Sequence, residues 1–172
     1  MKVVIVGGRS RADYLMGALA DVADKIVAVN NDRAFCEYLS SRHDEDVVWG
    51  DGTKRVVLED AGVSGFDVVV ALTACDADNL AICQVAKRFL GIRYQLCIVA
   101  NPENVRAFRR LGVTAAISGT ATLAQAIRDA MAEARESAPG AGEGAALERS
   151  LADAGSTGSL RGSWHLLRKG RA

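Results

Sequence analysis

The chain has 172 residues, close to the roughly 150 residues of one ordinary domain. Apolar residues make up 49% and charged residues 24%, a balance typical of a globular rather than a disordered chain. Lys plus Arg number 21 and Asp plus Glu also number 21, so the formal net charge is zero. This balance argues against a nucleic-acid binder, because such proteins bind phosphates through a basic excess.

The sequence shows neither a membrane-spanning stretch nor a secretory signal. Its strongest apolar run, Val68–Leu72, is far shorter than the roughly 18 residues of a span. A strand-like run follows Met1 and Lys2 directly, so we expect a cytoplasmic protein. The cysteines have no C-x-x-C spacing, which predicts reduced thiols rather than disulfides or a metal site; they are Cys36, Cys75, Cys83 and Cys97.

Short apolar runs alternate with helix-like segments along most of the chain. The runs are Val3–Val6, Ile26–Val29, Val47–Trp49, Val68–Ala71, Leu96–Val99 and Ala115–Ser118. The helix-like segments are Ala12–Asp21, Asp32–Arg42, Arg55–Ala61, Asn79–Leu90, Glu103–Leu111 and Thr122–Ala134. Continuous apolar runs are typical of strands covered on both faces, and crossovers of this length join parallel strands. We therefore predict an α/β, Rossmann-like doubly wound sheet of six parallel strands with helices on both faces.

The composition changes near Glu136. Seven of the 17 glycines follow it, and branched apolar residues become rare. Such a segment buries too little surface to offset its ordering entropy. We expect a domain over residues 1–135 and a disordered tail over 136–172. The apolar and then basic end, Trp164–Lys169, is interpreted as a solvated terminus; the alternative is a peptide that docks on a membrane or partner.

The turn after the first strand has the position of a phosphate-binding loop. A G-x-G-x-x-G fingerprint would place glycines at positions 7, 9 and 12, where this chain has Gly7, Arg9 and Ala12. Ala12 is an accepted variant, but Arg9 replaces the glycine that admits the pyrophosphate. Arg9 either blocks that approach or substitutes a charged contact with phosphate. The candidate residues of this turn are Gly7, Gly8, Arg9, Ser10 and Arg11.

The end of the second strand supplies the next candidates, Asn30 and Asn31. A dinucleotide site usually has Asp or Glu here to bind the ribose 2′-hydroxyl. Asn30 can hydrogen-bond a hydroxyl but lacks the charge that repels a 2′-phosphate. The alternative is that both asparagines only form a polar turn. Asp32 is expected to cap the second helix.

Two further strand exits carry the most specific patterns: Gly50-Asp51-Gly52-Thr53, and Thr73 followed by Asp76 and Asn79. With the strand Val3–Val6 and its glycines, they make residues 1–134 resemble the TrkA-N (KTN) domain of RCK proteins, the regulators of potassium conductance. The exits at Asn101-Pro102-Glu103 and Leu111-Gly112-Val113 are also similar. Arg9 and Asn30 depart from the family pattern, and only the tail occupies the place of its usual second domain.

The resemblance implies a cytosolic, dimer-forming sensor that binds an adenine nucleotide (NAD, NADP, ATP, ADP or AMP) and controls a membrane potassium channel or transporter. It places Asp51, Gly52 and Thr53 near the adenine and Thr73 near the ribose and phosphates. Thr53 could instead cap the following helix, and for Asp76 we favour a cap.

Other chemistry has little support in the sequence. His43 and His165 have no nucleophile pattern near them, so we expect no catalytic triad. Cys75, at a strand exit before a helix, is a weak candidate for redox sensing. Two alternatives stay open: an NADP-dependent oxidoreductase, and a scaffold that has lost its nucleotide and acts by dimerisation. The dimer stripe, defined as Leu123, Ala126, Ile127, Ala130, Met131 and Ala134, has helical spacing and could join two copies or cover the chain's own sheet.

Overall fold

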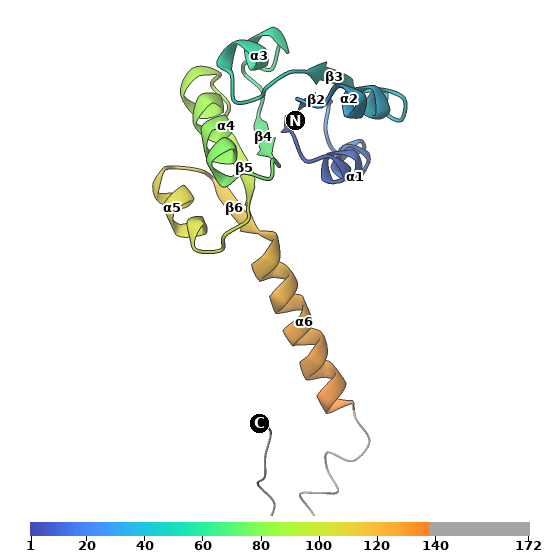
Figure 1. Cartoon of the computed structure of the whole chain (residues 1–172), viewed down its shortest axis with the longest axis vertical. Helices are drawn as coiled ribbons and strands as arrows, with labels where there is room; N and C mark the ends of the chain where they lie inside the picture. The colour runs from blue at the N-terminus through green and yellow to red at the C-terminus, as the bar shows by residue number, and fades with distance from the viewer. Residues whose placement is uncertain (138–172) are drawn as a thin grey trace, which may run out of the picture. The chain divides into compact units, whose positions relative to one another are not determined.

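The computed structural model describes residues 1–137 and shows six strands alternating with six helices (Figure 1). The strands are β1 Lys2–Val6, β2 Lys25–Asn30, β3 Asp46–Trp49, β4 Val68–Ala71, β5 Tyr94–Val99 and β6 Ala115–Ser118. The helices are α1 Ser10–Leu19, α2 Arg33–Ser40, α3 Arg55–Asp60, α4 Asp76–Phe89, α5 Asn104–Arg110 and α6 Gly119–Glu136. Every predicted strand and helix is present.

The strands form one parallel sheet in the order β3-β2-β1-β4-β5-β6. This arrangement confirms the predicted Rossmann-like doubly wound fold. The order reverses between β1 and β4, because the chain builds outward from β1 in one direction and then returns to β4. In such sheets ligands bind beyond the carboxyl ends of the strands at this reversal.

Alternate residues of each strand enter two separate cores, which explains the unbroken apolar runs. On one face, Val4, Val6 and other strand residues pack with residues of α3, α4 and α5, such as Ile82. On the other face, Val3 and Ile5 pack with α1 and α2, as Met16 and Leu39 show. The two cores hold β1 rigidly and thereby fix the turn that leaves it.

Three helices begin earlier than the sequence indicates: α1 begins at Ser10 rather than Ala12, and α4 and α6 each begin three residues early. Helix α4 begins at Asp76 rather than Asn79, because the Thr73 hydroxyl accepts the Cys75 N–H and turns the chain directly from β4. Helix α6 begins at Gly119 rather than Thr122, and the Ser118 hydroxyl accepts the Ala121 N–H at its start. In α4 and α6 a hydroxyl near the strand end satisfies a helix amide that would otherwise lack a partner.

The chain separates into two units, Met1–Ala126 and Ile127–Ala172. The first contains the whole sheet and the helices α1 to α5. The predicted disordered tail and its docking peptide fall almost entirely outside the described residues. Within the described part, no helix combines the length and apolar character needed to cross a bilayer.

Candidate functional site

A cleft of about 320 Å³ opens at the carboxyl ends of β1 to β4, where the strand order reverses. Every residue predicted as a nucleotide contact lines it except Ser10, which lines a neighbouring hollow. The other lining residues were not predicted as nucleotide contacts; they are Val6, Val29, Gly50, Leu72, Ala74, Cys75, Asp78 and Ile82. Most of them follow or end a strand, so their position in the parallel sheet is the signal that could have found them.

The turn from β1 to α1 forms one wall of the cleft. Gly7 and Gly8 have φ angles of 72° and 93°, which only glycine adopts readily. A Cβ on Gly8 would also lie 2.6 Å from the Cβ of Leu72, so the turn touches the end of β4 directly. The amides of Arg11, Ala12 and Asp13 donate to the carbonyls of Gly8 and Arg9. The amides of Gly8 and Arg9 themselves have no acceptor among the described residues and can serve an anion in the cleft.

Arg9 is the N-cap residue of α1 and the only described non-glycine residue with a positive φ, 43°. Its guanidinium does not fold back over the glycine turn. Nη2 instead donates to Oδ2 of Asp32 at 2.7 Å, which links the β1–α1 turn to the β2–α2 loop. The Arg9 side chain remains 73% exposed and lines the cleft. Asp32 also caps α2, as predicted, because its Oδ1 accepts the Phe35 N–H.

Asn30 and Asn31 line the cleft at the end of β2. The Asn30 side chain is buried, and its Oδ1 accepts the Asp32 N–H at 3.0 Å. The Asn31 carbonyl accepts from Trp49 Nε1 on β3. Both contacts fit a polar turn, and the turn also presents Asn30 to the cleft.

The loop after β3 is held by its own side chains. Oδ1 of Asp51 accepts both the N–H and the hydroxyl of Thr53, and this pair holds the pKa of Asp51 below its usual value. Gly52 lies so close to Val6 that a Cβ would overlap its side chain. The N-cap of α3 is Lys54, so the alternative of Thr53 as a helix cap is wrong. The Thr53 hydroxyl donates to the Asp51 carboxylate instead of accepting from a helix amide.

The polar residues after β4 act mainly as a scaffold. Asn79 is fully buried and its amide joins Thr73 to the Ile98 carbonyl on β5. Asp76 is the first residue of α4, not its N-cap. Its carboxylate accepts the Ala100 and Asn101 N–H groups and the Asn104 side chain. Although burial opposes it, these bonds lower the Asp76 pKa.

This arrangement corrects the expected role of Asp76. It lies in the first turn of α4, but its oxygens fasten the β5–α5 loop rather than the amides of its own helix. The Thr-x-x-Asp-x-x-Asn pattern therefore positions the cleft wall from behind, and its Thr73 lines the cleft itself.

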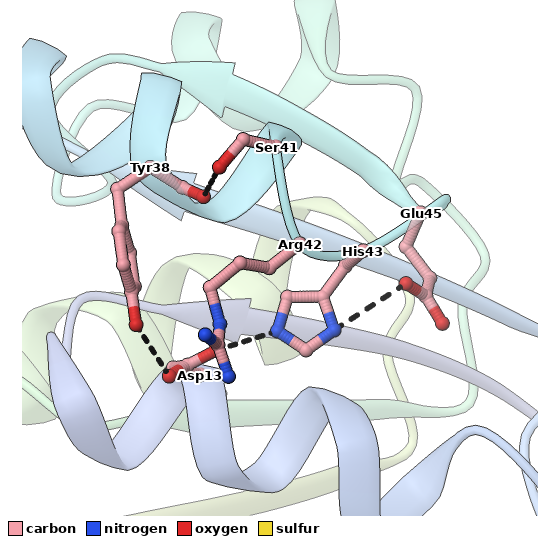
Figure 2. Close-up of polar contacts among 6 residues, drawn as sticks. All are labelled: Asp13, Tyr38, Ser41, Arg42, His43 and Glu45. Atoms are coloured by element: carbon pink, nitrogen blue, oxygen red, sulfur yellow. Dashed lines mark hydrogen bonds and ion pairs between the residues drawn. The ribbon is translucent and has the colours of Figure 1, made fainter.

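A second polar cluster braces α1 against the segment after α2 (Figure 2). Nε2 of His43 lies 2.7 Å from Oδ1 of Asp13, and Nδ1 lies 3.9 Å from Glu45. Tyr38 and Arg42 donate to the same Asp13 carboxylate. A carboxylate therefore lies beside each ring nitrogen of His43, which leaves no position for a nucleophile next to the ring. The cluster acts as a structural tie.

Cys75 is exposed and lines the cleft, whereas Cys36, Cys83 and Cys97 are buried. Within residues 1–137, no group of His, Cys, Asp or Glu side chains is arranged to hold a metal ion.

Comparisons with known proteins agree with this architecture. The family profile of the TrkA-N domain matches residues 3–119. The chain is similar to the Trk system potassium uptake protein TrkA homolog of Methanothermobacter thermautotrophicus, with 32% identity over 124 residues. The match covers 72% of this chain and 57% of that protein, so the chain spans less than two thirds of this relative.

Two solved structures have the same fold. The Kef CTD of Shewanella denitrificans in AMP-bound form has a TM-score of 0.66 at 18% identity, over 90% of this chain and 94% of that one. The GsuK channel bound to NAD has a TM-score of 0.59 at 20% identity, over 67% of this chain and 21% of that one. At these identities the likeness shows a shared fold.

Proposed function

The chain belongs to the TrkA-N domain family, and from that premise we propose that residues 1–135 form a nucleotide-binding domain that regulates a potassium channel or transporter. The cleft at the strand-order reversal carries the proposal. Its volume of about 320 Å³ suits a small-molecule site, and it is lined by a glycine turn whose Gly8 and Arg9 amides have no acceptor among the described residues. Two solved structures with this fold, the Kef CTD and the GsuK channel, have AMP and NAD bound, respectively.

Each wall of the cleft has a role in this proposal. The Gly7–Gly8 turn and the start of α1 hold phosphates, Asn30 and Arg9 face the adenosine ribose, and the loop from Asp51 to Thr53 borders the base. The domain binds without turnover, acts from the cytoplasm, and passes its nucleotide state to a membrane partner.

A second copy of the chain is part of the proposed assembly. All six residues of the dimer stripe on α6 are exposed. An apolar stripe of this kind is typical of a helix that packs on a partner. We assign the stripe to a homodimer contact.

Calorimetry on the full chain tests the binding site with AMP, ADP, ATP, NAD and NADP. We expect saturable binding of at least one nucleotide, recovered chemically unchanged afterwards. Ala74→Trp should weaken binding at least about tenfold, because Ala74 is exposed and lines the cleft. Ala77→Trp is the matched control, since Ala77 is exposed on α4 and does not line the cleft.

The regulatory role needs a cellular measurement. Loss of the chain should alter potassium uptake, and the unaltered chain but not Ala74→Trp should restore it. Restoration by Ala74→Trp despite lost binding would contradict nucleotide sensing. Absence of binding by every nucleotide would favour the scaffold alternative, and conversion of the ligand would favour the oxidoreductase.

A further inference from the structure

The ribose end of the cleft lacks a carboxylate. Dinucleotide-binding sheets usually present an acidic side chain at the end of β2 to accept hydrogen bonds from the ribose hydroxyls. Here Asp32 is the acid nearest to that position in sequence, and it lines the neighbouring hollow rather than the cleft. Both of its oxygens are engaged, one by the Phe35 N–H and the other by Arg9. The carboxylates that do line the cleft are Asp51 after β3 and Asp78 on α4.

Asn30 reverses the usual direction of hydrogen bonding at the end of β2. Its Oδ1 accepts the Asp32 N–H, and only the oxygen of an amide can accept, so the bond fixes which way the amide faces. Oδ1 of Asn30 is therefore already hydrogen-bonded within the protein. The NH2 group is the part of the Asn30 side chain left to serve the cleft, which the residue lines while only 3% exposed. A carboxylate in this place would accept hydrogen bonds, whereas Asn30 donates them.

Arg9 adds a cation to the same corner. A guanidinium has five N–H donors in a planar fork, and the described bond to Asp32 uses Nη2. The ion pair holds the Arg9 side chain between the cleft and the neighbouring hollow, both of which it lines. Guanidinium groups match phosphate geometry and form strong charge-assisted hydrogen bonds with it.

Asn30 therefore offers an N–H donor, and Arg9 a cation paired with Asp32, at the part of the cleft where an acidic side chain normally accepts hydrogen bonds from the ribose hydroxyls. We propose that this cleft prefers adenine nucleotides that carry a phosphate on the 2′-oxygen of the adenosine ribose, and that Arg9 with Asn30 determines this preference. The inference rests on the proposed nucleotide-binding function and names the ligand class of that site. It also accounts for Arg9 at a positive φ, because glycine there would relieve the backbone but remove the cation.

The test compares two ligands that differ only in the 2′-phosphate: adenosine 2′,5′-bisphosphate and 5′-AMP. Calorimetry on the full chain at fixed ionic strength should show the bisphosphate binding about ten- to a hundredfold more tightly, the range for hydrogen bonds to charged groups. Equal or tighter binding of 5′-AMP would overturn the preference and leave nucleotide binding intact. Binding of neither ligand would overturn the preference and the proposed function together.

Variants distinguish the specific effect of Arg9 and Asn30 from the effect of removing any positive charge. Arg9→Gly should remove most of the preference, because it removes the cation while glycine suits this backbone. Asn30→Asp should reverse the preference by placing a carboxylate at the ribose. Arg33→Ala is the matched control, since Arg33 lies at the start of α2 outside the cleft lining and should leave the ratio unchanged. A preference that survives Arg9→Gly, or that falls equally in Arg33→Ala, would overturn the assignment.

Discussion

Gly8 and Arg9 are adjacent residues with positive φ angles, and the structure needs them for different reasons. Gly8 has no room for a side chain, because the turn presses against Leu72. Arg9 keeps a largely exposed side chain that reaches Asp32 in the hollow next to the cleft. Packing therefore requires glycine at position 8. Arg9 has a strained backbone conformation, but it places a cation at the site.

Gly8→Ala should lower the free energy of unfolding by about 2–4 kcal/mol, because it adds a steric overlap to an unfavourable φ. Gly65→Ala is the matched control. Gly65 has φ 75° but open space around its Cβ position, so its substitution should cost only about 1 kcal/mol of backbone strain. Urea denaturation of both variants measures the difference. Equal losses would show that contact with Leu72 carries no cost.

At the scale of elements, side-chain ties join the helices α1 and α4, which border the cleft, to neighbouring segments. Asn79 and Asp76 join α4 to β5 and the loop beyond it, and Asp13 joins α1 to the segment after α2. The second tie is shown in Figure 2. It holds the first turn of α1, which directly follows the glycine turn that lines the cleft. Ties of this kind position the binding loops without contacting a ligand themselves.

The Asp13 tie should depend on pH. The hydrogen bond from His43 lowers the pKa of Asp13, although burial opposes it and the Arg42 charge adds to it. Because the folded-state pKa lies below the unfolded value near 3.8, the tie stabilises the fold above that pH and is lost as the pH falls through the folded-state pKa. Asp13→Asn should therefore lower the melting temperature near about pH 6 and have a smaller effect near about pH 3.

Thermal unfolding across this pH range checks the prediction. Asp44→Asn is its control, because Asp44 is an exposed neighbour of His43 for which the described residues provide no hydrogen bond or ion pair. A pH-independent difference between Asp13→Asn and the unaltered chain would contradict the role of the carboxylate charge.

At the scale of the whole molecule, α6 bears apolar side chains that are exposed among the described residues. Leu123, Ile127 and Met131 are 62%, 51% and 62% exposed. The sequence pattern allowed them either to cover the sheet or to meet a second copy. Leu123 belongs to the same unit as the sheet and is exposed, which favours the second copy, on which the dimer proposal depends.

Replacing Leu123 and Ile127 together by Asp should weaken self-association at least about tenfold, because two charges would enter an apolar contact. The control is Ala121→Asp with Ala132→Asp, which adds the same charge on the same helix outside the dimer stripe. Light scattering over micromolar concentrations measures the mass. A monomer mass for the unaltered chain, or equal effects of the two double variants, would contradict the dimer.

The sequence by itself determined the sheet, because alternating apolar runs and helical segments with long crossovers leave a doubly wound parallel fold as the consistent solution. It also located most of the cleft, since strand exits in a parallel sheet meet at one edge. The partners of the polar side chains were decided only in three dimensions. Arg9 and Asp32 are 23 residues apart, and Asp76 and Ala100 are 24 apart. The local pattern predicts a cap for Asp76, but the tertiary fold brings the amides of the β5–α5 loop to its carboxylate. The local pattern predicts the Asp32 cap correctly, but only the tertiary fold shows that the same carboxylate also binds Arg9.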